Sequence, residues 1–187
     1  MSDPNGERLL AIYLNDHLAG AYGGAALAAR IAREHPTGPD APDLRGLARE
    51  IAEDRDELVQ LMQTLGVRPR RHRMAMGAVA EKAGRLKLNG RLFRRSPLSD
   101  LLETEAMRSG VQGKIALWRA LQAVADDDLL TARLERLEGR ARGQAEILDA
   151  RQSEAAAVLR RAVAEAWPAA GRPDPVHGMR PQHAGRR

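Results

Sequence analysis

Four long stretches of the chain repeat apolar residues at alternating spacings of three and four, and Pro or Gly stands between the stretches. This spacing matches the 3.6 residues per turn of an α-helix and places the apolar residues on one face. Ala, Leu, Arg and Glu, which are all good helix formers, dominate the composition. The pattern therefore predicts an all-α protein with four amphipathic helices.

Proline and capping residues predict where each helix begins and ends. Asp40, with Pro42 just after it, has the features of a helix start, and Ser96-Pro97 has them again. Pro36 and Gly66 are expected to end the first two helices. The predicted helices run from about residue 4 to 34, 40 to 65, 97 to 125 and 126 to 167.

The lengths of the connections predict how the helices are arranged. The first and second helices are joined by a few residues, and the third and fourth by almost none, so each pair is expected to form an antiparallel hairpin. The crossover between the hairpins is long, residues 67–95, so the second and third helices should run parallel. A short helix is expected inside it, with one apolar face formed by Met76, Val79, Ala80, Ala83 and Leu86.

This helix order, the long crossover and two segments together resemble the ferritin-like superfamily over about residues 5–165. The segments are YLNDHLAGAYGGAALAARIA and LAREIAEDRDELVQLM, the second of which resembles the second bundle helix of rubrerythrin-like proteins. The resemblance implies a ferritin-like four-helix bundle, here residues 1–166, and a di-iron site built from Glu and Glu-x-x-His motifs. No Glu precedes a His by three positions in this chain, so an intact site of that kind is excluded.

Several polar residues nevertheless occupy positions where the helical pattern expects apolar ones. They are His17, Asp54, Glu105 and Gln112, and Glu50 and Glu57 flank Asp54 on the same side of its helix. A buried carboxylate without a partner is costly, so we favour a hydrogen-bonded core network with Arg partners. Candidate partners are Arg55, Arg119 and Arg140. The alternatives are an iron or manganese site made by His17, Glu50, Asp54 and Glu105, or exposure of these groups to solvent.

Glycines in the helices form a second unusual feature. Gly20, Gly23 and Gly24 lie inside the first predicted helix, and Gly110 and Gly113 inside the third. Each costs about 1 kcal/mol relative to Ala in a helix interior. We favour a close approach of the two helices as the compensating gain. A homodimer face or a thin ligand cavity is the alternative.

Positive charge is concentrated in the crossover, where residues 68–95 include ten Lys or Arg and one acid. We favour a solvated crossover that neutralises an acidic body. Nucleic-acid binding, an anionic membrane surface or a protein partner are alternatives. The residues that would contact nucleic acid are Arg68, Arg70, Arg71, Arg73, Arg94 and Arg95.

The chain has no Cys, which excludes disulfide scaffolds, thiolate metal sites and Cys nucleophiles. Its first twenty residues lack a signal-peptide pattern, and no stretch reaches the ~18 apolar residues of a membrane span, so we expect a cytoplasmic protein. The Pro-, Gly- and Arg-rich tail, residues 167–187, is expected to be disordered.

No nucleophile motif or phosphate-binding loop appears in the sequence, so an enzymatic role is not favoured. The leading hypothesis is a non-enzymatic structural or interaction protein without a cofactor, acting on a protein partner or as a homodimer. A metal-binding oxidoreductase or metal-storage protein with a non-standard site is the alternative, and a nucleic-acid-associated protein is the second alternative.

Overall fold

A computed structural model describes residues 4–70 and 97–167 of the chain. These residues form four α-helices, which confirms the predicted all-α class and the approximate helix positions. The helices are α1 (Pro4–Glu34), α2 (Ala41–Thr64), α4 (Pro97–Gln122) and α5 (Asp128–Ala166). None of them is long and apolar enough to cross a membrane.

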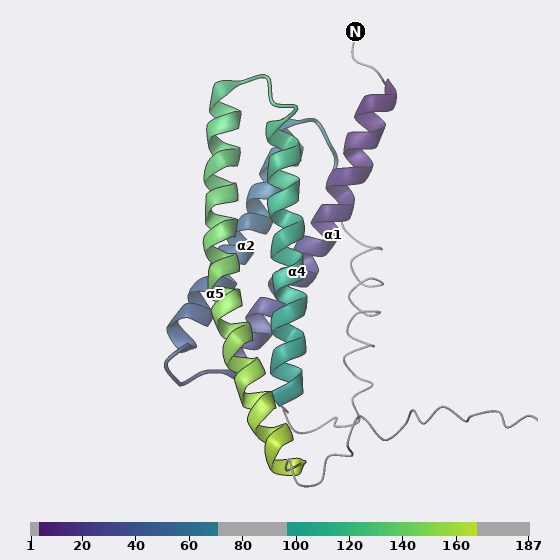
Figure 1. The fold of residues 1–187 in the computed structure, drawn as a ribbon. Helices are drawn as coiled ribbons and strands as arrows, with labels where there is room; N and C mark the ends of the chain where they lie inside the picture. Colours follow the sequence, from purple (N-terminus) through teal and green to yellow (C-terminus); the bar gives the residue numbers. More distant parts are fainter. Residues whose placement is uncertain (1–3, 71–96, 168–187) are drawn as a thin grey trace, which may run out of the picture.

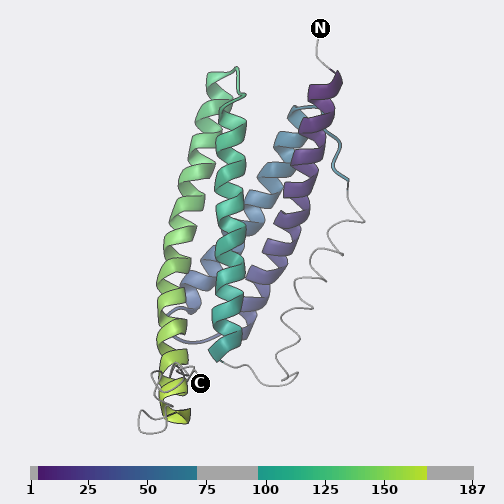
Figure 2. The ribbon, with the colours of Figure 1, turned by 45° about the vertical axis from the view of Figure 1, so that its right-hand side comes forward.

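The helices form two antiparallel hairpins, α1 with α2 and α4 with α5 (Figure 1). The two hairpins pack side by side, with α1 against α4 and α2 facing α5 (Figure 2). The helices α2 and α4 run in the same direction, as predicted from the long connection between them. The expected crossover helix around residues 76–86 and nearly all of the tail lie outside the described residues.

Local interactions at the helix ends explain most of the boundaries. The side chain of Asp127 caps α5 by accepting hydrogen bonds from the amides of Leu129 and Leu130, both at 3.1 Å. Gly66 follows α2 with φ of +70°, a left-handed conformation that suits glycine. Asp40 is the N-cap residue of α2, as predicted, but its side chain makes no capping hydrogen bond. It accepts one from Arg151 of α5 instead.

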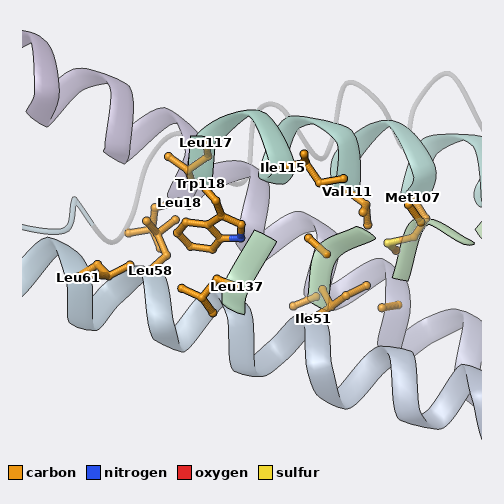
Figure 3. Close-up of a cluster of buried hydrophobic side chains, with 14 of the residues drawn as sticks. Leu18, Ile51, Leu58, Leu61, Met107, Val111, Ile115, Leu117, Trp118 and Leu137 are labelled. Carbon is orange, nitrogen blue, oxygen red and sulfur yellow. The ribbon is translucent and has the colours of Figure 1, made fainter. Parts of the chain in front are cut away.

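A single apolar core joins the four helices. Trp118 of α4 is completely buried and belongs to the same cluster as Leu18, Leu58 and Leu137, which come from the other three helices (Figure 3). Burial of these side chains is the main force that holds the hairpins together.

The predicted register of α4 is wrong in its first half. Gln112 is exposed and Glu105 is half-buried, while Glu103, which was not singled out, is 6% exposed. The helical repeat that runs back from Trp118 passes through Val111 and not through Gln112.

Candidate functional site

Asp54 of α2 is the centre of a polar cluster buried between the hairpins. Its side chain is 2% exposed. Lys114 Nζ from α4 donates to Asp54 Oδ2, and Arg140 Nε from α5 donates to Asp54 Oδ1 at 2.7 Å. One carboxylate thus connects α2 with both helices of the other hairpin, and two cations compensate its charge.

Gln144 of α5 completes this cluster. Its Oε1 accepts from Lys114 Nζ at 2.5 Å, and its Nε2 donates to Asp54 Oδ2 at 3.0 Å and to Glu50 Oε2 at 3.1 Å. Burial lowers the pKa of Lys114, and the adjacent Asp54 opposes that shift. Asp54, Lys114 and Gln144 therefore satisfy one another in the core.

The cluster is the middle of a longer row of polar contacts between α2 and α5. Arg133 Nε donates to Glu57 at 2.9 Å on one side of the cluster. Arg151 Nη1 donates to Asp40 at 3.2 Å on the other side. We call this row the α2–α5 seam. Long side chains bridge the two helices here, and α2 and α5 have few close backbone approaches.

Glu138 of α5 forms a second cluster within the α4–α5 hairpin. It is 8% exposed and accepts from Arg119 at 2.6 Å, from Gln122 at 3.0 Å and from Arg142 at 2.6 Å. These hydrogen bonds, with Arg142 and Arg119 contributing most, lower the pKa of Glu138 to about 2.

A cavity of about 670 Å³ lies beside the Asp54 cluster, between α1, α2 and α4. Its walls are mostly apolar or glycine, and Asp54 and Lys114 form part of its lining. This volume is within the range of ~300–1,000 Å³ that is typical of small-molecule pockets. His17 and Tyr13 also line the cavity, and their rings meet edge to face with centroids 4.6 Å apart. Burial lowers the pKa of His17, and the negative charge of Asp16 opposes that shift.

The helix glycines line this cavity, and the favoured prediction of a close helix approach is wrong for four of the five, while Gly23 stays a prediction. A Cβ built on Gly20, Gly24, Gly110 or Gly113 would meet no atom of a neighbouring element within 4 Å in the described part of the chain. All four glycines line the cavity. Their effect is to leave open space, which agrees with the ligand-cavity alternative.

The structure brings only some of the four predicted metal ligands together. Glu50 and Asp54 share Gln144 as a partner. His17 lines the cavity on α1, and Glu105 is not among its lining residues. Residues 4–70 and 97–167 contain no group of three or more His, Asp or Glu side chains arranged to hold a metal ion.

Asp54 was predicted to belong to a hydrogen-bonded core network with arginine partners, and its contacts agree with this prediction. Arg140 is one of the predicted partners. The other two suggested arginines are engaged elsewhere, Arg55 with Asp56 and Arg119 with Glu138. Lys114 was missed. It precedes the buried Trp118 by four positions, one helical turn, and this spacing could have revealed it.

Two of the six predicted basic-patch residues are described, Arg68 and Arg70, and both are exposed. The side chain of Asn15 in α1, which was not predicted to have a role, forms hydrogen bonds with the backbone of both residues. Its Oδ1 accepts from the Arg70 amide at 2.7 Å, and its Nδ2 donates to the Arg68 carbonyl at 3.3 Å. The remaining four, Arg71, Arg73, Arg94 and Arg95, lie outside the described residues.

Comparison of the chain with known proteins found no relative. No protein-family model, no curated protein and no solved structure matches the chain.

Proposed function

We propose that this protein is a non-enzymatic binding protein that holds a small molecule in the cavity between α1, α2 and α4. The observation that carries the proposal is the open space in front of Gly20, Gly24, Gly110 and Gly113. Four helix-interior glycines cost about 4 kcal/mol relative to alanines, and no close approach among the four described helices compensates for that cost at these positions. A bound molecule that fills the space would supply the missing contacts.

The scaffold supports a ferritin-like relationship within this proposal. The order of the helices, the two antiparallel hairpins and the parallel course of α2 and α4 agree with that arrangement.

The donor set does not fit the iron or manganese that the ferritin-like resemblance brings to mind. Asp54, the most deeply buried of the candidate ligands, is already enclosed by Lys114, Arg140 and Gln144. Two fixed cations beside a carboxylate oppose the entry of a third. We therefore assign this cluster to holding the two hairpins together.

Binding of Nile red, a neutral dye whose emission increases in apolar surroundings, tests the proposed function. We expect the full-length protein to bind the dye. Gly113→Leu should abolish binding, because a leucine side chain would occupy the cavity. Gly46→Leu is the matched control, since Gly46 is also a half-buried helix glycine with open space but does not line the cavity. Equal binding by the two variants would contradict the proposal.

Nucleic-acid binding is a second candidate, favoured by the exposure of Arg68 and Arg70 on a backbone that Asn15 holds in place. Lys and Arg that neutralise phosphates release counterions, so affinity falls steeply with salt. Titration of a single-stranded oligonucleotide at several NaCl concentrations tests this candidate. The variant Arg68→Ala/Arg70→Ala should reduce the salt slope by roughly 1.4 for a single strand. A binding curve that does not change with salt would rule the candidate out.

A further inference from the structure

Arg55 of α2 lies at the edge of the cavity where α2 meets α1. The central carbon of its guanidinium is 5.4 Å from the centre of the Tyr22 ring of α1, so the charged group bridges the two helices. Arg55 is one of the residues that line the cavity, and its side chain is 26% exposed. A molecule that enters the cavity from solvent can therefore contact this side chain.

The guanidinium of Arg55 is held on one edge and one face, and its other edge has no acceptor in the described part of the chain. Nε and Nη2 both donate to Asp56 Oδ1, at 2.9 Å and 2.7 Å. The group lies over the ring of Tyr22, which is favourable for a cation. The second edge, formed by Nη1 and the other N–H of Nη2, has two parallel donors. Such an edge matches the two oxygens of a carboxylate.

The other Lys and Arg residues of the lining are paired with buried acids. Lys114 is paired with Asp54, whose side chain is 2% exposed. Arg30 is paired with Glu103, whose side chain is 8% exposed. Asp56, in contrast, is 60% exposed, and an exposed ion pair of this kind contributes little to stability. A ligand carboxylate can therefore join the guanidinium of α2 without displacing a buried partner.

The remaining walls indicate what the rest of such a ligand is made of. Leu27, Ile51, Leu58 and Met107 offer hydrocarbon, and the helix glycines leave open space beside them. Burying apolar ligand surface against these side chains is favourable, whereas a second charge inside the cavity would lose its water without gaining a partner. Asp16 also belongs to the lining, but it is exposed, so water and salt screen its repulsion of a carboxylate.

We propose that the cavity binds an amphipathic carboxylic acid, whose carboxylate accepts two hydrogen bonds from the Nη1–Nη2 edge of Arg55. This inference rests on the proposed binding function and adds the chemical class of the ligand. The hydrocarbon body lies along the glycines of α1 and α4. The carboxylate lies at the edge between α1 and α2, where it remains partly hydrated and its desolvation cost is small.

Decanoate and decan-1-ol, which share a hydrocarbon chain and differ in the head group, test the inference. Isothermal titration calorimetry with the full-length protein at pH 7, where the acid is ionised, measures both affinities. We expect both to bind and decanoate to bind about ten-fold more tightly, the effect of a charge-assisted contact in a partly exposed site. In Arg55→Gln this preference should be lost. The matched control is Arg49→Gln, which removes the same charge from an exposed position of α2 outside the cavity lining and should keep the preference.

The outcomes separate this inference from the proposed function. Equal affinities in the wild type, or a decanoate preference that survives in Arg55→Gln or is lost equally in Arg49→Gln, would overturn the role of Arg55 and leave the binding function standing. The wild-type comparison decides even if Arg55→Gln does not fold, which circular dichroism shows.

The cavity variants complete the test. Loss of decanoate binding in Gly113→Leu but not in Gly46→Leu would place the hydrocarbon chain in the cavity, and unchanged binding in both would overturn the inference. Failure of decanoate and decan-1-ol to bind a wild type that still binds Nile red would overturn the ligand class. Absence of Nile red binding as well would overturn the proposed function.

Discussion

Asp54 is a charged group in the core because its partners are fixed on two other helices. Taking a carboxylate out of water is costly, and the cost is repaid only when the partners are well placed. Lys114 and Arg140 provide two cations, and Gln144 provides an amide donor. Removal of this one side chain would leave two cations facing each other.

Asp54→Ala should therefore be strongly destabilising. We expect a loss of about 3 kcal/mol in the free energy of unfolding, the lower end for a broken buried pair, because Arg140 stays partly exposed. Urea denaturation followed by circular dichroism measures the loss.

The matched control is Asp56→Ala, which breaks an ion pair with Arg55 on the exposed side of the same helix. It should cost at most about 1 kcal/mol, as for other surface pairs. Similar losses in the two variants would mean that the buried cluster does not hold the hairpins together.

The lowered pKa of Glu138 determines how this residue's contribution to the free energy of unfolding changes with pH. Its pKa is lowered from 4.5 to about 2, so the fold favours the ionised form. Its contribution is complete above pH 4.5 and is lost as the pH falls toward 2. We expect Glu138→Gln to cost about 1 kcal/mol at pH 7, because both arginines are more than half exposed, and the difference from the wild type to shrink at pH 2.5.

Urea denaturation at pH 7 and pH 2.5 measures this change. Glu135→Gln, an exposed residue of the same helix, is the control for removing one negative charge. A Glu138→Gln difference that stays the same at both pH values would contradict the assignment.

At the scale of the elements, the glycines of α1 and α4 leave space and do not improve packing. Local sequence explains the helix ends, since prolines and Asp127 act within a few residues. It does not explain four helix-interior glycines, whose effect appears only where α1 and α4 face each other. Substituting alanine for one of these glycines should therefore show what the glycine costs in helix stability.

Gly20→Ala should stabilise the protein by about 1 kcal/mol, because the residue is helical and a methyl group there meets open space. Gly66→Ala should destabilise it by a similar amount, although space is open there too, because φ of +70° strains a residue with a Cβ. Thermal unfolding of both variants, compared with the wild type, measures the two effects. We expect the unfolding temperature to rise in Gly20→Ala and to fall in Gly66→Ala. Equal shifts in the two variants would show that Gly66 does not adopt the left-handed conformation.

At the scale of the whole molecule, the two hairpins meet through one polar and one apolar set of contacts. Between α2 and α5 the contacts are polar, along the α2–α5 seam. Trp118 and the leucines around it form an apolar core that all four helices share. The Asp54 cluster lies beside this core, so neither hairpin can separate without disrupting both.

The described helices should therefore unfold together. In Trp167→Phe, which removes an exposed tryptophan, fluorescence reports on Trp118 alone. We expect its urea transition to coincide with the loss of helix measured by circular dichroism, as in a two-state protein. A fluorescence change at lower urea would show that the hairpins separate before their helices unfold.

The sequence by itself determined the four helices, their approximate ends and the arrangement in hairpins, because helical periodicity, prolines and connection lengths are local properties. It also marked Asp54 and the glycines as unusual, since each departs from the expected apolar or helix-favouring residue. The tertiary structure decided that Lys114 and Arg140 meet Asp54, that Glu103 and not Glu105 is buried, and that the glycines border a cavity. These outcomes depend on how each helix is rotated toward its neighbours. A rotation of one position changes the partner of every side chain while the local pattern stays almost the same.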